Sequence, residues 1–129
     1  MSRARRILLV GLGSELLTTL LWIGVVLALT IMEGQTSRGT VSSIGAYFSI
    51  ALGFVGSAIG GYWVGLRSRT AIQDGALVGV IASCANVLMT ASLGQLGSLA
   101  SLVFVRCLAR VIGGVSGGWI ATKSPRRQD

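Results

Sequence analysis

The chain has 129 residues, of which 52% are hydrophobic and 12% are charged, so it is far more apolar than an ordinary soluble domain. It contains no histidine, which excludes histidine-based acid–base catalysis and His-ligated metal or haem centres. The net charge is +7, but the cations gather at the ends of apolar runs, and this pattern indicates membrane topology and not a nucleic-acid surface.

Four apolar runs follow one another along the chain, and each approaches or exceeds the roughly 20 residues that cross a hydrocarbon core about 30 Å thick. The sequence therefore predicts an all-α, multi-pass membrane protein in which residues 1–129 form a single four-helix transmembrane domain. Polar segments separate the runs and mark the helix ends. The expected helices are Ile7–Met32, Ser43–Leu66, Ala76–Leu93 and Leu99–Thr122.

The first run follows the basic segment MSRARR, which has the character of a signal-peptide n-region. The run is too long for an h-region and no A-x-A-like cleavage site closes it, so we expect it to remain as a transmembrane helix. It carries one charge within the membrane, Glu15, and only a short glycine pattern, Gly11 and Gly13. We therefore expect this helix to be the most peripheral of the four.

The second run places a small residue at every fourth position. Because this spacing advances 400° per step on a 3.6-residue helix, the small positions form one slanting line. Such lines let two helix backbones approach closely in lipid, where dispersion contacts drive helix association. We expect a helix-packing face at the bundle centre or at an oligomer interface, and a glycine-lined pore is the rival interpretation. The line consists of Gly45, Ser49, Gly53, Ser57, Gly61 and Gly65.

The third run opens with small residues at the same spacing, Gly75, Gly79 and Ser83. It also carries three polar residues, Ser83, Asn86 and Thr90, at positions i, i+3 and i+7. This spacing places them on one side of the helix. Polar side chains within a membrane helix commonly form hydrogen bonds to a neighbouring helix. We therefore expect these three residues to bond between helices.

The fourth run carries a line related to that of the second, with further glycines beside it at Gly114 and Gly118. The two lines are candidates to face each other. The members of this line are Ala109, Gly113, Gly117 and Ala121.

The same run contains two arginines one turn apart, Arg106 and Arg110. At about 1.5 Å per residue, Glu15 and Arg110 lie at similar depths from one membrane face, so we expect them to form an ion pair between helices. Arg106 lies one turn nearer the other face, and we expect it to extend toward the headgroups there. These charges either fix the position of the first helix or form an ion, proton or anion site.

Nine cations lie outside the expected helices, and eight of them fall on one side of an even-numbered bundle. The excess of Lys and Arg marks the cytoplasmic side, so both termini and the central loop are expected in the cytoplasm and the protein in the cell inner (plasma) membrane. Tyr62, Trp63 and Trp119 lie near the same side and are typical of interfacial anchors. The eight cations are Arg3, Arg5, Arg6, Arg67, Arg69, Lys123, Arg126 and Arg127.

Two segments, GSAIGGYWVGLRSR and GGVSGGWIATKSPR, share a glycine and aromatic pattern with an offset of 57 residues. The match raises two alternatives. Either the chain contains a repeated two-helix hairpin, related by an axis along the membrane normal, or glycine-rich helix ends coincide without common descent.

The segment GGYWVGLRSRTAIQDGALVGVI, Gly60 to Ile81, joins two glycine-rich helices through a basic turn, and GGVSGGW lies in the last helix. In these features the chain resembles a family of small four-helix bacterial membrane proteins of unknown function. The resemblance implies a four-helix inner-membrane protein, and it assigns no role to Glu15 or to the arginine pair.

The sequence contains no paired-carboxylate, HExxH or Walker-type motif, so we expect no catalytic, metal or cofactor site and no enzymatic activity. The first hypothesis is a homo-oligomer or an accessory or scaffold subunit that recognises other membrane subunits through its glycine-lined faces, with lipid around it. The alternative is a small transporter or channel that uses Glu15, Arg106 and Arg110. A holin-like protein that forms membrane lesions is a third and weaker hypothesis.

Overall fold

The computed structural model describes residues 2–33, 38–94, 97 and 100–124. The described chain is all-α, and each of its four helices is long and apolar enough to cross a membrane. The prediction of a multi-pass helical membrane protein in contact with a lipid bilayer is therefore confirmed at this level. The helices are α1 (Arg3–Glu33), α2 (Arg38–Gly65), α3 (Ala71–Ser92) and α4 (Ala100–Lys123).

The largest differences from the expected bounds are at the starts of two helices: α2 starts at Arg38 and not at Ser43, and α3 starts at Ala71 and not at Ala76. The sequence QDG in the first turn of α3 looks like a polar loop. An aspartate is nevertheless favourable there, because the exposed N–H groups of a first helical turn attract negative charge. Asp74 is 1% exposed and accepts a hydrogen bond from Arg3 Nε at 3.0 Å, which compensates the burial of its charge.

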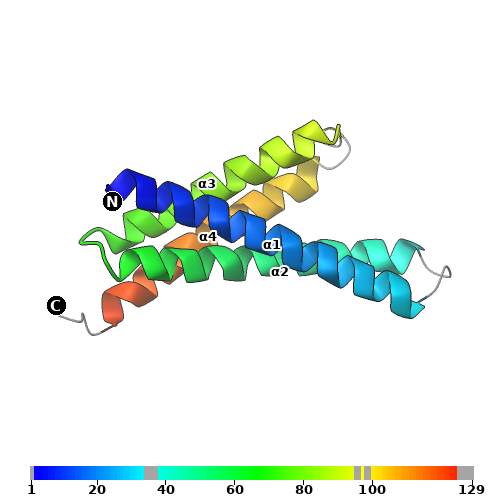
Figure 1. Ribbon diagram of the computed structural model, residues 1–129, viewed down its shortest axis with the longest axis horizontal. Coiled ribbons are helices and arrows are strands. Elements are labelled where there is room, and N and C mark those ends of the chain that lie inside the picture. Colours follow the sequence, from blue (N-terminus) through cyan, green and yellow to red (C-terminus); the bar gives the residue numbers. More distant parts are fainter. Residues whose placement is uncertain (1, 34–37, 95–96, 98–99, 125–129) are drawn as a thin grey trace.

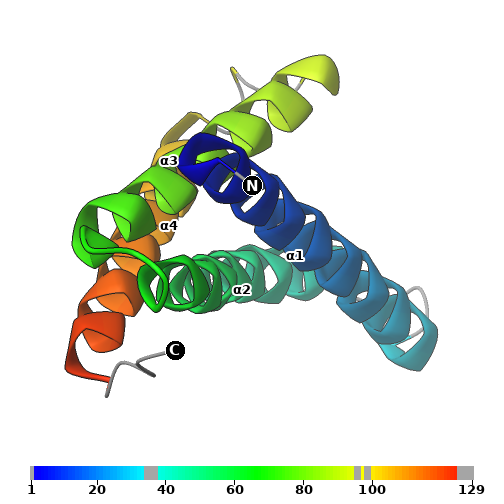
Figure 2. The ribbon, with the colours of Figure 1, turned by 60° about the vertical axis from the view of Figure 1, so that its left-hand side comes forward.

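The helices form two hairpins, α1–α2 and α3–α4 (Figure 1). Both chain ends and the α2–α3 connection lie at one end of the molecule, which we call the terminal end (Figure 1). The opposite end, which carries the α1–α2 and α3–α4 connections, we call the hairpin end. Figure 2 shows that the hairpins are close together at the terminal end and diverge toward the hairpin end.

Contact between the hairpins depends on glycines of α2 and α4. A Cβ atom added at Gly61 would overlap the backbone of Gly114, and one added at Gly117 would overlap the backbone of Ala58. Only a residue without a side chain permits this approach, as expected for small-residue contacts in membranes. The expectation that the two small-residue lines face each other is correct here, and the touching backbones leave no space for a pore along this contact.

The helix α4 uses a second, adjacent glycine row against α3. A Cβ atom added at Gly114 would overlap Gly75, and one added at Gly118 would overlap Ala71. Gly79 of α3 in turn lies against the backbone of Arg110. Thus α4 packs against α2 on one face and against α3 on the next.

The small-residue line of α2 has different roles along its length. Toward the terminal end, Ser57 is 2% exposed and Gly65 lies against α3 and α4. Toward the hairpin end, a Cβ atom added at Gly45 would meet nothing within 4 Å, while its carbonyl oxygen accepts a hydrogen bond of 3.0 Å from Trp22 Nε1. The line is therefore a backbone-docking surface only in its terminal half.

The helix α1 is the least buried of the four, as the sequence predicts. Only 11% of its most apolar stretch lies inside the protein, compared with 33% for α2 and for α3. It packs beside a second pair of small residues on α2, where Gly56 contacts Thr18 and Gly60 contacts Val10. The aliphatic core is correspondingly small and lies between α1, α2 and α3 near the terminal end; its buried members are Ile7, Val64 and Val78.

Aromatic and basic side chains meet at the terminal end. The guanidinium of Arg67 lies 5.2 Å from the centroid of the Trp63 ring, and Lys123 Nζ lies 3.6 Å from that of Trp119. Cation–π contacts of this kind suit a membrane interface, where the ring is partly in lipid and the cation in water. Arg126 and Arg127 lie outside the described residues.

Candidate functional site

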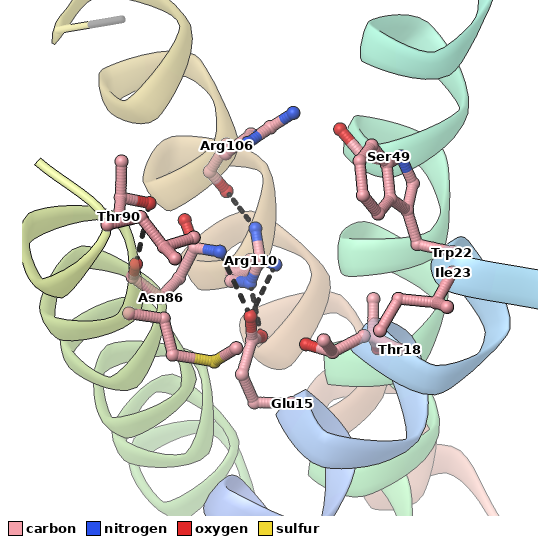
Figure 3. Close-up of a pocket in the computed structure, with 12 residues that line it drawn as sticks. Glu15, Thr18, Trp22, Ile23, Ser49, Asn86, Thr90, Arg106 and Arg110 are labelled. Atoms are coloured by element: carbon pink, nitrogen blue, oxygen red, sulfur yellow. Dashed lines mark hydrogen bonds and ion pairs between the residues drawn. The ribbon is translucent and has the colours of Figure 1, made fainter. Parts of the chain in front are cut away.

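An ion pair lies between the two hairpins, at the base of the space where they separate (Figure 3). Arg110 Nε donates to Glu15 Oε2 at 2.7 Å, and Arg110 Nη2 donates to Glu15 Oε1 at 2.8 Å. The Arg110 and Glu15 side chains are 3% and 4% exposed, respectively. Two parallel hydrogen bonds between charged groups give the strongest geometry available to such a pair. The pairing of Glu15 with Arg110 expected from their depths is confirmed.

Neighbouring groups hold the pair in place. Asn86 Nδ2 of α3 donates to Glu15 Oε1 at 3.1 Å, and Arg110 Nη1 donates to the Arg106 carbonyl oxygen at 3.3 Å. A Cβ atom added at Gly53 would lie 2.9 Å from Arg110 Nη1. Gly53 therefore faces α4, as a helix-packing residue would, but there it makes room for a guanidinium and not for a helix backbone.

The predicted polar cluster of α3 is divided between two environments. The Ser83 hydroxyl donates to the Gly79 carbonyl oxygen at 2.8 Å and also lies 3.2 Å from the Cys107 carbonyl oxygen of α4. Asn86 bonds to α1, as expected for an interhelical polar residue. The Thr90 hydroxyl donates to the Asn86 carbonyl oxygen of its own helix at 2.9 Å, and no bond from Thr90 to another helix is found among the described residues.

A cleft of about 230 Å³ opens beside the ion pair, between α1 and α2 on one side and α3 and α4 on the other. Its base is polar and its mouth is apolar. The polar lining comprises Glu15, Thr18, Thr19, Ser49, Asn86, Thr90, Arg106 and Arg110. The apolar lining comprises Trp22, Ile23, Met89 and Leu93.

Arg106 lines this cleft, and its side chain extends away from the Glu15–Arg110 pair (Figure 3). Its Nε atom is buried and has no hydrogen-bond partner among the described residues. The same is true of Asn86 Oδ1. The sequence-based expectation that Arg106 extends to the headgroups did not foresee this cleft, which exists because the hairpins diverge.

The cleft therefore contains two guanidinium groups and one carboxylate, an excess of one positive charge. It also contains a buried donor, Arg106 Nε, and a buried acceptor, Asn86 Oδ1, that have no hydrogen-bond partner among the described residues. Buried polar atoms in proteins nearly always find a partner. The arrangement is chemically suited to hold an anionic group with a hydrogen-bond donor nearby.

Several residues of the cleft were not predicted to belong to a site. Thr18 and Trp22 look like ordinary members of an apolar run, and Ser49 was assigned to the packing line. Ser49 is buried and its hydroxyl donates to the Ala46 carbonyl oxygen at 2.8 Å, but it borders the cleft. Thr18 and Trp22 follow Glu15 by three and seven residues, so they lie on the same face of α1. This spacing was the available sign that they lie near Glu15.

Comparison with known proteins identifies no match for this chain among protein-family models, curated proteins or solved structures. The resemblance to small four-helix bacterial membrane proteins stays a prediction.

Proposed function

We propose that this chain is a non-enzymatic membrane transport protein that binds an anionic ligand in the cleft between its hairpins. The observation that supports the proposal is the charge balance there, two arginines against Glu15, with Arg106 Nε buried and unpartnered among the described residues. An uncompensated cation within a membrane is costly. A bound anion would offset this cost, so the charge balance of the cleft favours anions over cations.

The transport hypothesis has more support than the scaffold hypothesis. A scaffold or homo-oligomer that recognises partners through glycine faces needs those faces to be free. Gly61, Gly113 and Gly117 instead lie against backbone of the same chain. A partner subunit would have to bind another surface, whereas the three intramembrane charges do come together in one cleft.

The two ends of the molecule differ in a way that fits one state of a transport cycle. At the terminal end the hairpins are held together by glycine contacts, and Arg3 of α1 bonds to Asp74 of α3. At the hairpin end they diverge (Figure 2). Because Lys and Arg are in excess at the terminal end, we propose that this end is cytoplasmic. The cleft, which opens toward the hairpin end, would then face the outer side. Rotation of one hairpin against the other would then expose the site to the opposite side.

Thermal unfolding of lipid-free protein in a non-ionic detergent tests the binding site. Sodium phosphate or acetate replaces sodium chloride at constant ionic strength. We expect one of these anions to raise the melting temperature, with a stabilisation of about 1.4 kcal/mol when its concentration reaches ten times its dissociation constant.

Arg106→Gln should abolish the stabilisation by removing the free guanidinium. Arg67→Gln is the matched control, because it removes one positive charge from the exposed terminal end and should leave the anion effect intact. Equal responses of the unmodified protein and the Arg106→Gln variant would contradict the proposed function.

A further inference from the structure

We infer that the ligand of the cleft is an anionic phospholipid, which enters sideways from the membrane leaflet at the hairpin end. This inference rests on the proposed function and names its substrate class. It is carried by the depth of Arg106, by the apolar mouth of the cleft, and by two buried atoms of the lining residues, Arg106 Nε and Asn86 Oδ1, that have no partner among the described residues.

The depth of Arg106 matches that of a lipid headgroup. Arg106 lies six residues after the first residue of α4, Ala100–Lys123, which is about 9 Å along the helix. The 24 residues of α4 extend about 36 Å, so each end passes the boundary of a hydrocarbon core about 30 Å thick by about 3 Å. The Cα atom of Arg106 is thus about 6 Å below that boundary, within reach of a phosphate when the long side chain extends.

The mouth of the cleft lies toward lipid. Trp22 and Ile23 of α1 and Met89 and Leu93 of α3 form its apolar lining. Ile23 is 45% exposed, Met89 43% and Leu93 71%, and on a membrane-spanning helix such exposed apolar residues face acyl chains. A water-borne anion would pass unfavourably between these side chains, but acyl chains can remain against them while the headgroup enters.

The size and chemistry of the cleft suit a headgroup. A volume of about 230 Å³ is below the roughly 300–1,000 Å³ of sites that enclose a whole drug-sized ligand, so the acyl chains would stay outside. A phosphodiester supplies a negatively charged partner for the Arg106 guanidinium. A headgroup hydroxyl supplies the donor that Asn86 Oδ1 lacks, and phosphatidylglycerol offers both groups.

Quenching of Trp22 fluorescence by brominated lipids tests this inference directly, because Trp22 borders the mouth. The Trp63→Phe/Trp119→Phe variant retains Trp22 as its single tryptophan. It is reconstituted in phosphatidylcholine vesicles that contain a minor fraction of brominated phosphatidylglycerol. The parallel sample contains the same fraction of brominated phosphatidylcholine.

We expect brominated phosphatidylglycerol to occupy the quenching site with about fivefold preference, the value for one favourable contact between a basic residue and an anionic lipid. Arg106→Gln should remove the preference, Arg106→Lys should retain part of it, and Arg67→Gln should leave it unchanged. Equal quenching by the two lipids, or a preference that survives Arg106→Gln, would overturn the lipid proposal.

Addition of inorganic phosphate separates the two sources of an anionic group. We expect phosphate at millimolar concentration to leave the lipid preference unchanged. If phosphate abolishes the preference, in addition to stabilising the lipid-free protein through Arg106, the ligand is a free anion; the proposed function then stands and the lipid inference fails. If neither phosphate nor the anionic lipid shows an effect that depends on Arg106, both proposals fail.

Discussion

Removal of one partner of the Glu15–Arg110 pair should destabilise the protein strongly, and removal of both should cost no more. The two side chains share hydrogen bonds of 2.7 and 2.8 Å and are at most 4% exposed. Truncating one member of such a buried pair leaves the other charge uncompensated, which costs about 3–5 kcal/mol. An independent value for two charge-assisted hydrogen bonds, about 1.5–3 kcal/mol each, gives about 3–6 kcal/mol, which overlaps this range.

Glu15→Gln leaves Arg106 and Arg110 without a carboxylate, and Arg110→Gln leaves Glu15 with only its bond to Asn86. The double variant removes both charges and places two amide side chains where they can bond to each other. We therefore expect each single variant to lose about 3–5 kcal/mol and the double variant to lose no more than either, a coupling energy of at least about 3 kcal/mol.

Reversible unfolding in mixed micelles with increasing dodecyl sulfate, followed by circular dichroism, measures these free energies. As a control, Glu15→Gln combined with Arg67→Gln should be additive within about 0.5 kcal/mol, because the two sites are far apart. If Glu15→Gln and Arg110→Gln were additive as well, the ion pair would not exist in the folded protein and the account of the cleft base would be wrong.

The glycine contacts and the Arg3–Asp74 bonds at the terminal end give four further predictions. Gly117→Ala should lower the unfolding free energy by about 1–3 kcal/mol in the same assay, because its Cβ atom would separate two backbones; an unchanged value would contradict close packing of α2 and α4. Gly53→Ala should cost less, because the atom it meets is the end of the Arg110 side chain, and a larger loss than for Gly117→Ala would refute this order. Gly13→Ala, whose Cβ atom meets nothing within 4 Å, should be neutral or stabilising by up to about 1 kcal/mol, as a control for both. Arg3→Gln should speed hydrogen exchange of the second-turn amides of α1, which donate to carbonyl groups of the first turn, by removing the bonds of Arg3 to Asp74; unchanged exchange would show that these bonds do not hold the start of α1.

The four helices and the ion pair could be predicted because both depend on position along a helix. Hydropathy shows where each span lies, and a rise of about 1.5 Å per residue places Glu15 and Arg110 at matching depths. The start of α3 at Ala71 could not be predicted, because Asp74 in its first turn is compensated by Arg3, 71 residues earlier in the chain.

The cleft could not be predicted because it depends on helix tilt, which the sequence does not encode locally. Position along the helix predicts the depth of Arg106, but whether its side chain meets lipid or a cavity depends on how far the hairpins diverge. Gly53 shows the same limit. Its spacing from Gly61 is typical of backbone docking, but the α4 residue that faces it is Arg110, so the missing side chain accommodates a guanidinium.

The central claim is that the cleft between the hairpins holds an anionic group at Arg106. The most direct test is an experimental structure of the full chain in nanodiscs that contain phosphatidylglycerol. We predict density for a phosphate group within hydrogen-bonding distance of the Arg106 guanidinium, with acyl chains between α1 and α3. A closed contact between Trp22 and Met89, or an Arg106 side chain bound to an acidic group of the protein itself, would contradict the account.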